Sequence, residues 1–215
     1  MKKNFILSMA IAYTMLAACS NDEIVDVNTG GTISFRTLID IATRTNQETT
    51  ASLSTFKGTA IKDAGTEFAT TVTKSGSEWN TAETYYWPNY ALKFYAYANG
   101  PAAGKGRVSI TKDAKTITDF TPAGNVTEHK DLLVAYNTGT KDNYNSSPVP
   151  LIFKHALSQI EVKAKNEKAS SVKVEIIGVK LVNMATKATL TFPESTLDNT
   201  KLPINNWSNQ TDLNI

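Results

Sequence analysis

The sequence predicts an all-β fold, because apolar side chains recur at every second residue in short runs that turn residues separate. Beyond residue 31, no window of helix length shows the apolar spacing of an amphipathic helix. Threonine is abundant, and its β-branched side chain suits a half-exposed pleated surface. Many short strands at this spacing favour β-sandwich domains.

The expected strands follow one another along the chain with turn residues between them. In order, they lie at residues 33–35, 68–72, 92–97, 108–110, 117–120, 132–136, 172–177 and 179–182. Clusters of Gly, Pro, Asn and Ser separate them, for example at residues 74–77 and 122–125. The longest polar interruption covers residues 137–148, and we expect a domain boundary there.

Charge and cysteine content exclude several classes of protein. The 215 residues carry 22 Lys and Arg against 20 Asp and Glu, without a basic cluster, so we expect no nucleic-acid partner. A single Cys excludes an intramolecular disulfide and a cysteine-rich metal site. The core must therefore come from apolar burial alone, and about 70% of the unfolded surface can be buried at this size.

The start of the chain has the features of a secretory signal. Lys2 and Lys3 precede an apolar run over residues 5–18, which is shorter than the roughly 20 residues of a bilayer span. The run ends in Leu-Ala-Ala-Cys at Cys19 and resembles the lipobox of bacterial lipoproteins, which implies lipidation of Cys19 and a membrane anchor. The alternative is a signal peptide cut after a small residue, with Cys19 incidental.

Few residues carry catalytic or metal-binding chemistry. His129 and His155 each lack a second His or Cys at metal-ligand spacing. The glycine-rich segment 100–106 lacks the spacing of a phosphate-binding loop, and Gly106 stands where the Mg²⁺-binding hydroxyl belongs. Carboxylates are scattered singly, so no acid–base pair is indicated. We therefore expect no enzyme activity, no cofactor and no metal.

The densest aromatic stretch contains Tyr85, Tyr86, Trp87 and Tyr90. Exposed and coplanar rings there would suit a glycan-binding surface lipoprotein, which is the alternative function. In the other interpretation, alternate rings fill the core of a sandwich while their neighbours face outward. We favour the core interpretation, and the positions of these rings in the fold distinguish the two.

Several segments together resemble the fimbrillin family of Bacteroidetes, the subunits of lipoprotein-derived pili. They are the lipobox at Cys19 and residues 32–36, 42–45, 85–88, 92–98, 131–135 and 151–160, of which the last is the most specific. The resemblance implies two transthyretin-like β-sandwich domains and a lipidated precursor on the outer membrane surface. It also implies that proteolysis after an arginine frees the first strand, and that a donor strand from another subunit fills the emptied groove.

Within this resemblance, the chain divides into a signal peptide (1–18), a flexible tether (19–31), an N-terminal sandwich (32–147) and the start of a second sandwich (148–215). The first strand, residues 32–38, is expected to be removable, with Ile33 and Phe35 as its apolar plugs. Arg44 lies in a polar stretch without periodicity and is the expected site of proteolytic processing.

The second sandwich is expected to be incomplete, because few residues follow residue 148 for an independent domain. Either the reading frame is truncated, or the subunit accepts a strand without giving one. We favour truncation, because an unfinished sandwich leaves apolar edges exposed. The expected function is a structural subunit of surface fimbriae that supports cell adhesion. Its expected partners are other fimbrillin subunits, the outer membrane through the lipid on Cys19, and host or bacterial surface ligands.

Overall fold

The computed structural model describes residues 31–39, 49–158, 160–167, 171, 173–180, 182, 184–194 and 206–212. The expected lipidation site Cys19 and the expected processing site Arg44 both lie outside these residues. The prediction of an all-β fold is confirmed. The named helices of the described residues are short: α1 (Lys141–Tyr144) and the 3-10 turn η1 (Val126–Glu128).

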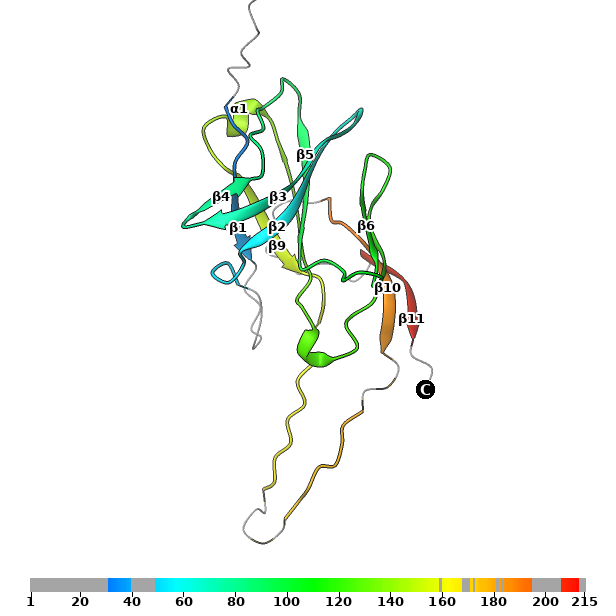
Figure 1. The fold of residues 1–215 in the computed structure, drawn as a ribbon. Coiled ribbons are helices and arrows are strands. Elements are labelled where there is room, and N and C mark those ends of the chain that lie inside the picture. The colour runs from blue at the N-terminus through cyan, green and yellow to red at the C-terminus, as the bar shows by residue number, and fades with distance from the viewer. Residues whose placement is uncertain are drawn as a thin grey trace, which may run out of the picture.

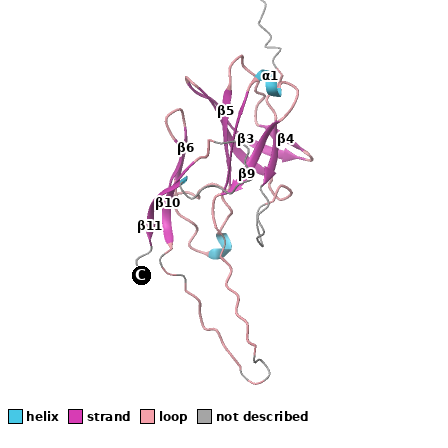
Figure 2. Cartoon of the chain, turned by 180° about the vertical axis from the view of Figure 1, so that it is seen from behind, coloured by secondary structure: helices cyan, strands magenta, loops and turns pink. Residues whose placement is uncertain are grey.

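The strands form a closed barrel and a second, smaller sheet, which Figure 1 shows as two neighbouring parts and Figure 2 shows from behind. The barrel has the strand order β1-β4-β3-β2-β5-β8-β9, and the second sheet has the order β11-β10-β7-β6. The bounds are β1 (Phe35–Ile39), β2 (Thr55–Lys62), β3 (Gly65–Ser75), β4 (Glu78–Thr81), β5 (Leu92–Ala98), β6 (Arg107–Ile110), β7 (Lys115–Phe120), β8 (Leu133–Gly139), β9 (Val149–His155), β10 (Ala185–Thr191) and β11 (Trp207–Asp212).

The inner core of the barrel is apolar and rich in aromatic rings. The ring of Phe56 packs against those of Phe35, Trp79 and Phe153, with centroid distances of 6.0, 5.1 and 5.3 Å. These edge-to-face and tilted contacts add to the stabilisation that burial of the rings provides. The aromatic residues therefore come from strands that lie far apart in the sequence and hold the barrel together from inside.

Strands β5 and β8 are buried on both faces. In β5, Phe94 belongs to the inner core and Tyr95 to a second buried cluster. In β8, Ala135 and Val134 divide between the two clusters in the same way. The second cluster also contains side chains of β7 and β10, so it joins the second sheet to the outside of the barrel. Burial on both faces explains the continuous apolar runs at residues 94–98 of β5 and 133–136 of β8.

A polar contact accompanies the second cluster. Tyr95 donates its hydroxyl hydrogen to Glu194 Oε1 at 2.8 Å, and Lys115 Nζ lies 3.9 Å from the same oxygen. Burial raises the pKa of Tyr95, and the hydrogen bond with Glu194 raises it further. Burial also raises the pKa of Tyr136, and the charge of Glu194 acts in the same direction. Both phenols are thus held in their neutral form.

We expect the protein to lose stability in alkaline solution because of Tyr95 and Tyr136. An unfolded chain releases tyrosine protons at about pH 10, whereas the buried phenols keep theirs to higher pH. Their contribution to the free energy of unfolding is therefore fully present below about pH 10. It falls as the pH rises further, by up to about 1.4 kcal/mol per pH unit for each phenol. Urea unfolding between about pH 8 and pH 11 measures this slope. The double variant Tyr95→Phe, Tyr136→Phe should have a shallower slope, and an unchanged slope would contradict the prediction.

The expected boundary between residues 147 and 148 does not separate the two sheets. Strand β9 follows the boundary, yet it pairs with β8 and β1 in the barrel. Strand β7 precedes the boundary, yet it pairs with β10 in the second sheet. Each sheet thus contains strands from before and after the expected boundary, because strands pair according to shape and register rather than sequence order. The division into two sandwich domains stays a prediction.

The strands expected at residues 172–177 and 179–182 are wrong, since residues 173–180 and 182 belong to no strand. Together with residues 160–167, they form an extended arm that runs away from the two sheets (Figure 1). Most apolar side chains of the arm are exposed. The two-residue period is present there, but no described strand lies beside it to complete a ladder. Isolated pairs of extended segments are marginally stable in water.

Candidate functional site: the strand that closes the barrel

The first described segment closes the barrel. Strand β1 runs parallel to β9 over all of its residues, from Phe35 to Ile39. On its other side, it pairs with β4 at one position, where Phe35 lies opposite Trp79. Without β1, the order of the sheet would run from β4 to β9 with a seam between these two strands. We call residues 31–39 the closing strand.

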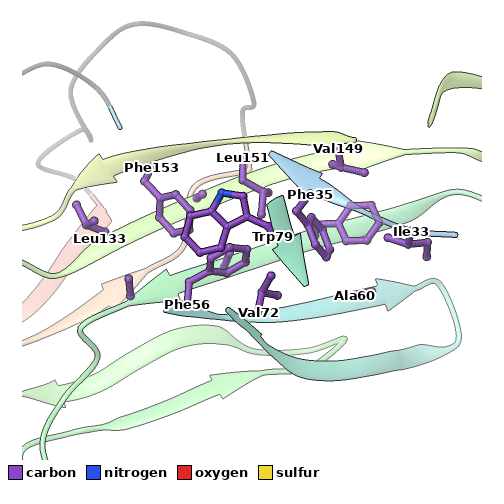
Figure 3. Close-up of a cluster of buried hydrophobic side chains, with 14 of the residues drawn as sticks. Ile33, Phe35, Phe56, Ala60, Val72, Trp79, Leu133, Val149, Leu151 and Phe153 are labelled. Atoms are coloured by element: carbon purple, nitrogen blue, oxygen red, sulfur yellow. The ribbon is translucent and has the colours of Figure 1, made fainter. Parts of the chain in front are cut away.

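Alternate side chains of the closing strand point into the inner core, and Figure 3 shows Ile33 and Phe35 in this position. The buried inward side chains, with their exposed fractions, are Ile33 (4%), Phe35 (4%), Thr37 (6%) and Ile39 (8%). The ring of Phe35 stands edge-on to those of Phe56 and Phe94, with centroid distances of 6.0 and 5.6 Å. We call the core space that these four side chains fill the slot.

A short antiparallel pairing holds the start of the closing strand. Thr32 lies opposite Tyr86, outside the named strands. The two flanking hydrogen bonds run from Ile33 N–H to Tyr85 O (2.8 Å) and from Trp87 N–H to Gly31 O (3.1 Å). These bonds flank the pair rather than join it, so Thr32 and Tyr86 form a non-hydrogen-bonded pair. In such pairs, the two Cα atoms are about 4.5 Å apart.

Side chains fasten both ends of the closing strand. Gly31 N–H donates to Asn145 Oδ1 at 2.7 Å, and Ile39 N–H donates to Thr50 Oγ1 at 3.0 Å. A Cβ atom at Gly31 would overlap the backbone oxygen of Asn145, so only glycine allows this close approach. The segment is therefore held by hydrogen bonds at its ends and by apolar burial along its length.

Ile33 and Phe35, the plugs expected from the sequence, both lie in the inner core. Thr37 and Ile39 also point inward, although the sequence interpretation did not include them. The two-residue period continues through both positions, so that period was the signal that could have found them. The polar side chain of Thr37 interrupts the apolar pattern. Release of this strand during assembly stays a prediction.

The two histidines make local contacts. Nδ1 of His155 lies 2.5 Å from Oδ2 of Asp131, and both side chains are largely buried. Nε2 of His129 lies 2.8 Å from the backbone oxygen of Ala123. In the part of the chain that the structure describes, no three His, Cys, Asp or Glu side chains gather closely enough to hold a metal ion. Across the same residues, no helix combines the length and apolarity that a bilayer crossing requires.

The densest aromatic stretch is divided between core and surface. Trp87 is buried, and Tyr85 stacks on Phe68 with ring centroids 3.9 Å apart. Tyr86 and Tyr90 are exposed. A glycan-binding module of the kind considered above needs several of these rings exposed and coplanar. Since two of the four pack against other side chains, the arrangement favours the core interpretation.

The fold and this site define an all-β protein whose barrel is closed by a short segment from the start of the described chain. A family model of fimbrillin-like proteins matches residues 26–214, and the chain belongs to the fimbrillin-like family. The resemblance noted in the sequence is thus confirmed.

Comparison with solved structures finds similarity to a fimbrial protein from Bacteroides vulgatus ATCC 8482, whose crystal structure was determined at 2.55 Å resolution. The identity is 19% and the TM-score is 0.49, and the match covers 85% of this chain and 64% of that chain. The chain therefore spans less than two thirds of the length of that protein. Comparison with curated proteins finds no match.

Proposed function

We propose that this protein is a pilus subunit that assembles by donor-strand exchange. Proteolysis after Arg44 separates the closing strand from the rest of the chain, and an extended strand of another subunit then takes its place in the slot. The lipid on Cys19 holds the precursor at the outer membrane before processing. The assembled fimbriae support adhesion to host or bacterial surfaces.

The observation that carries this proposal is the position of the closing strand in the barrel. The other six strands of the barrel form a continuous sheet from β4 to β9. Loss of the closing strand would leave two unpaired sheet edges and uncover apolar rings such as Phe56 and Phe94. Such an opening is suited to an added strand, which supplies backbone hydrogen bonds to the edges and alternate side chains to the pockets.

Substitution of the processing residue should abolish assembly. Treatment of the full chain with an arginine-specific protease should give heat-labile multimers on a denaturing gel, with Thr45 as the new first residue. Arg44→Ala should remove both cleavage and multimers, because an uncut chain keeps the closing strand at a high effective concentration beside its slot. N-terminal sequencing and the gel measure these results.

The chain offers matched controls, since it holds three arginines. Arg36 lies within β1, and Arg107 begins β6. Arg36→Ala and Arg107→Ala should leave cleavage and multimers intact. A mature start at a residue other than Thr45 would refute Arg44 as the site. Multimers that still hold residues 31–39 in the slot would refute donor-strand exchange.

A further inference from the structure

Thr37 is an unusual occupant of the slot. Its side chain points into the barrel core and is 6% exposed, and its inward neighbours on the same strand, Phe35 and Ile39, are apolar. Among the residues that the structure describes, Thr37 Oγ1 is the one buried side-chain polar atom without a hydrogen-bond partner. A buried hydroxyl that loses water and gains no partner destabilises the state that contains it.

Another buried threonine of the barrel shows the usual arrangement. Thr70 in β3 is also nearly fully buried. Its hydroxyl donates to the backbone oxygen of Thr71 at 3.3 Å and accepts from Ala82 N–H at 3.4 Å. The barrel can therefore satisfy a buried threonine, and Thr37 differs because its position in the slot provides no partner.

From this contrast we infer that Thr37 makes the closing strand a replaceable occupant of its own slot. The slot prefers an aliphatic β-branched side chain at the position that Thr37 occupies. An incoming strand with Val or Ile at this position binds more tightly than the closing strand itself. Valine has nearly the shape of threonine and brings no hydroxyl. This inference rests on the proposed function, and it names the chemistry by which the slot selects its donor strand.

The other inward positions give the incoming strand no such advantage. Ile33, Phe35 and Ile39 are already apolar and buried, so a donor strand has no unpaired polar group to replace at these positions. The outward side chains Arg36 and Leu38 are exposed, so they contribute little to the choice of occupant. Discrimination between the resident and a donor strand is therefore concentrated at Thr37.

A peptide competition tests the preference directly. The full chain is cut between residues 39 and 49 by an inserted protease site, so that the closing strand is no longer tethered and a peptide can replace it. Two labelled peptides are added, one with the sequence of residues 31–39 and one with Thr37→Val in that sequence. The valine peptide should bind about 5- to 30-fold more tightly. A peptide with Leu38→Val serves as the control and should bind like the native sequence.

Substitutions in the uncut chain give a second, independent readout. Thr37→Val should lower the unfolding equilibrium constant by about 5- to 30-fold, whereas Thr70→Val should raise it, because only the latter loses hydrogen bonds. Equal binding of the two peptides, or a Thr37→Val chain no more stable than the native one, would overturn the inference. If Thr37→Val stabilises the chain but neither peptide enters the slot, donor-strand exchange is refuted and the cost of the Thr37 hydroxyl still stands.

Discussion

Cross-linking the closing strand to its neighbour should abolish assembly completely and reversibly. The pair Thr32→Cys, Tyr86→Cys is suited to this test, because Thr32 and Tyr86 lie opposite each other as a non-hydrogen-bonded antiparallel pair. Their Cα atoms in such a pair are about 4.5 Å apart, which lies within the range that a disulfide bridges. Both side chains are exposed, so the substitutions leave the inner core intact.

The cross-link should leave cleavage unaffected and prevent release of the closing strand. In a Cys19→Ser background, the two new thiols are the only ones in the chain. Oxidised protein treated with an arginine-specific protease should stay monomeric on a denaturing gel, and added reductant should restore the multimers. The single variants Thr32→Cys and Tyr86→Cys are the controls, and both should assemble in oxidising buffer. Multimers formed by fully cross-linked protein would show that the closing strand need not leave.

Truncation of the main plug should cost the unprocessed chain much of its stability. Phe35 is 4% exposed and packs edge-on against two rings of the inner core. Phe35→Ala should therefore lower the free energy of unfolding by about 3–5 kcal/mol, through lost burial and a cavity that the neighbouring strands fill only partly. Since whole domains are stable by about 5–15 kcal/mol, urea unfolding should show a large shift in midpoint.

A matched control lies three residues further along the same strand. Leu38 points outward and is 49% exposed. Leu38→Ala should change the free energy of unfolding by about 0.5 kcal/mol or less, although it also removes a large apolar side chain from β1. Similar effects of the two substitutions would contradict the assignment of Phe35 as a plug and of the slot as a packed core.

The all-β class and the burial of Ile33 and Phe35 could be predicted from local pattern, because the two-residue period is a property of the segment itself. Strand β2 was missed, since Lys57, Gly58 and Lys62 interrupt its apolar residues. Hydrogen-bonded pairing with β3 on one edge and with β5 on the other makes that segment a strand. Local pattern also failed in the other direction in the extended arm, where alternation is clear but no described strand lies alongside.

The candidate site could be predicted only in part. Sequence indicated which side chains would be buried in the first strand, but it could not show that this strand lies between β4 and β9. That arrangement depends on register across a long sequence separation. The free-energy cost of the unpaired Thr37 hydroxyl could not be predicted either. Threonine is common in strands, and only the three-dimensional surroundings show that this hydroxyl has no hydrogen-bond partner.

The long separation between the closing strand and its neighbours has a consequence for folding kinetics. Gly31 and Asn145, which meet at the start of the closing strand, are 114 residues apart. The pairings of β2 with β3 and of β3 with β4 are local, so they can form early, whereas the parallel pairing of β1 with β9 must await a large loop closure. Each newly made chain should thus spend time as a nearly finished barrel with its seam open. In that state, the open seam would expose the chain to premature capture by neighbouring chains.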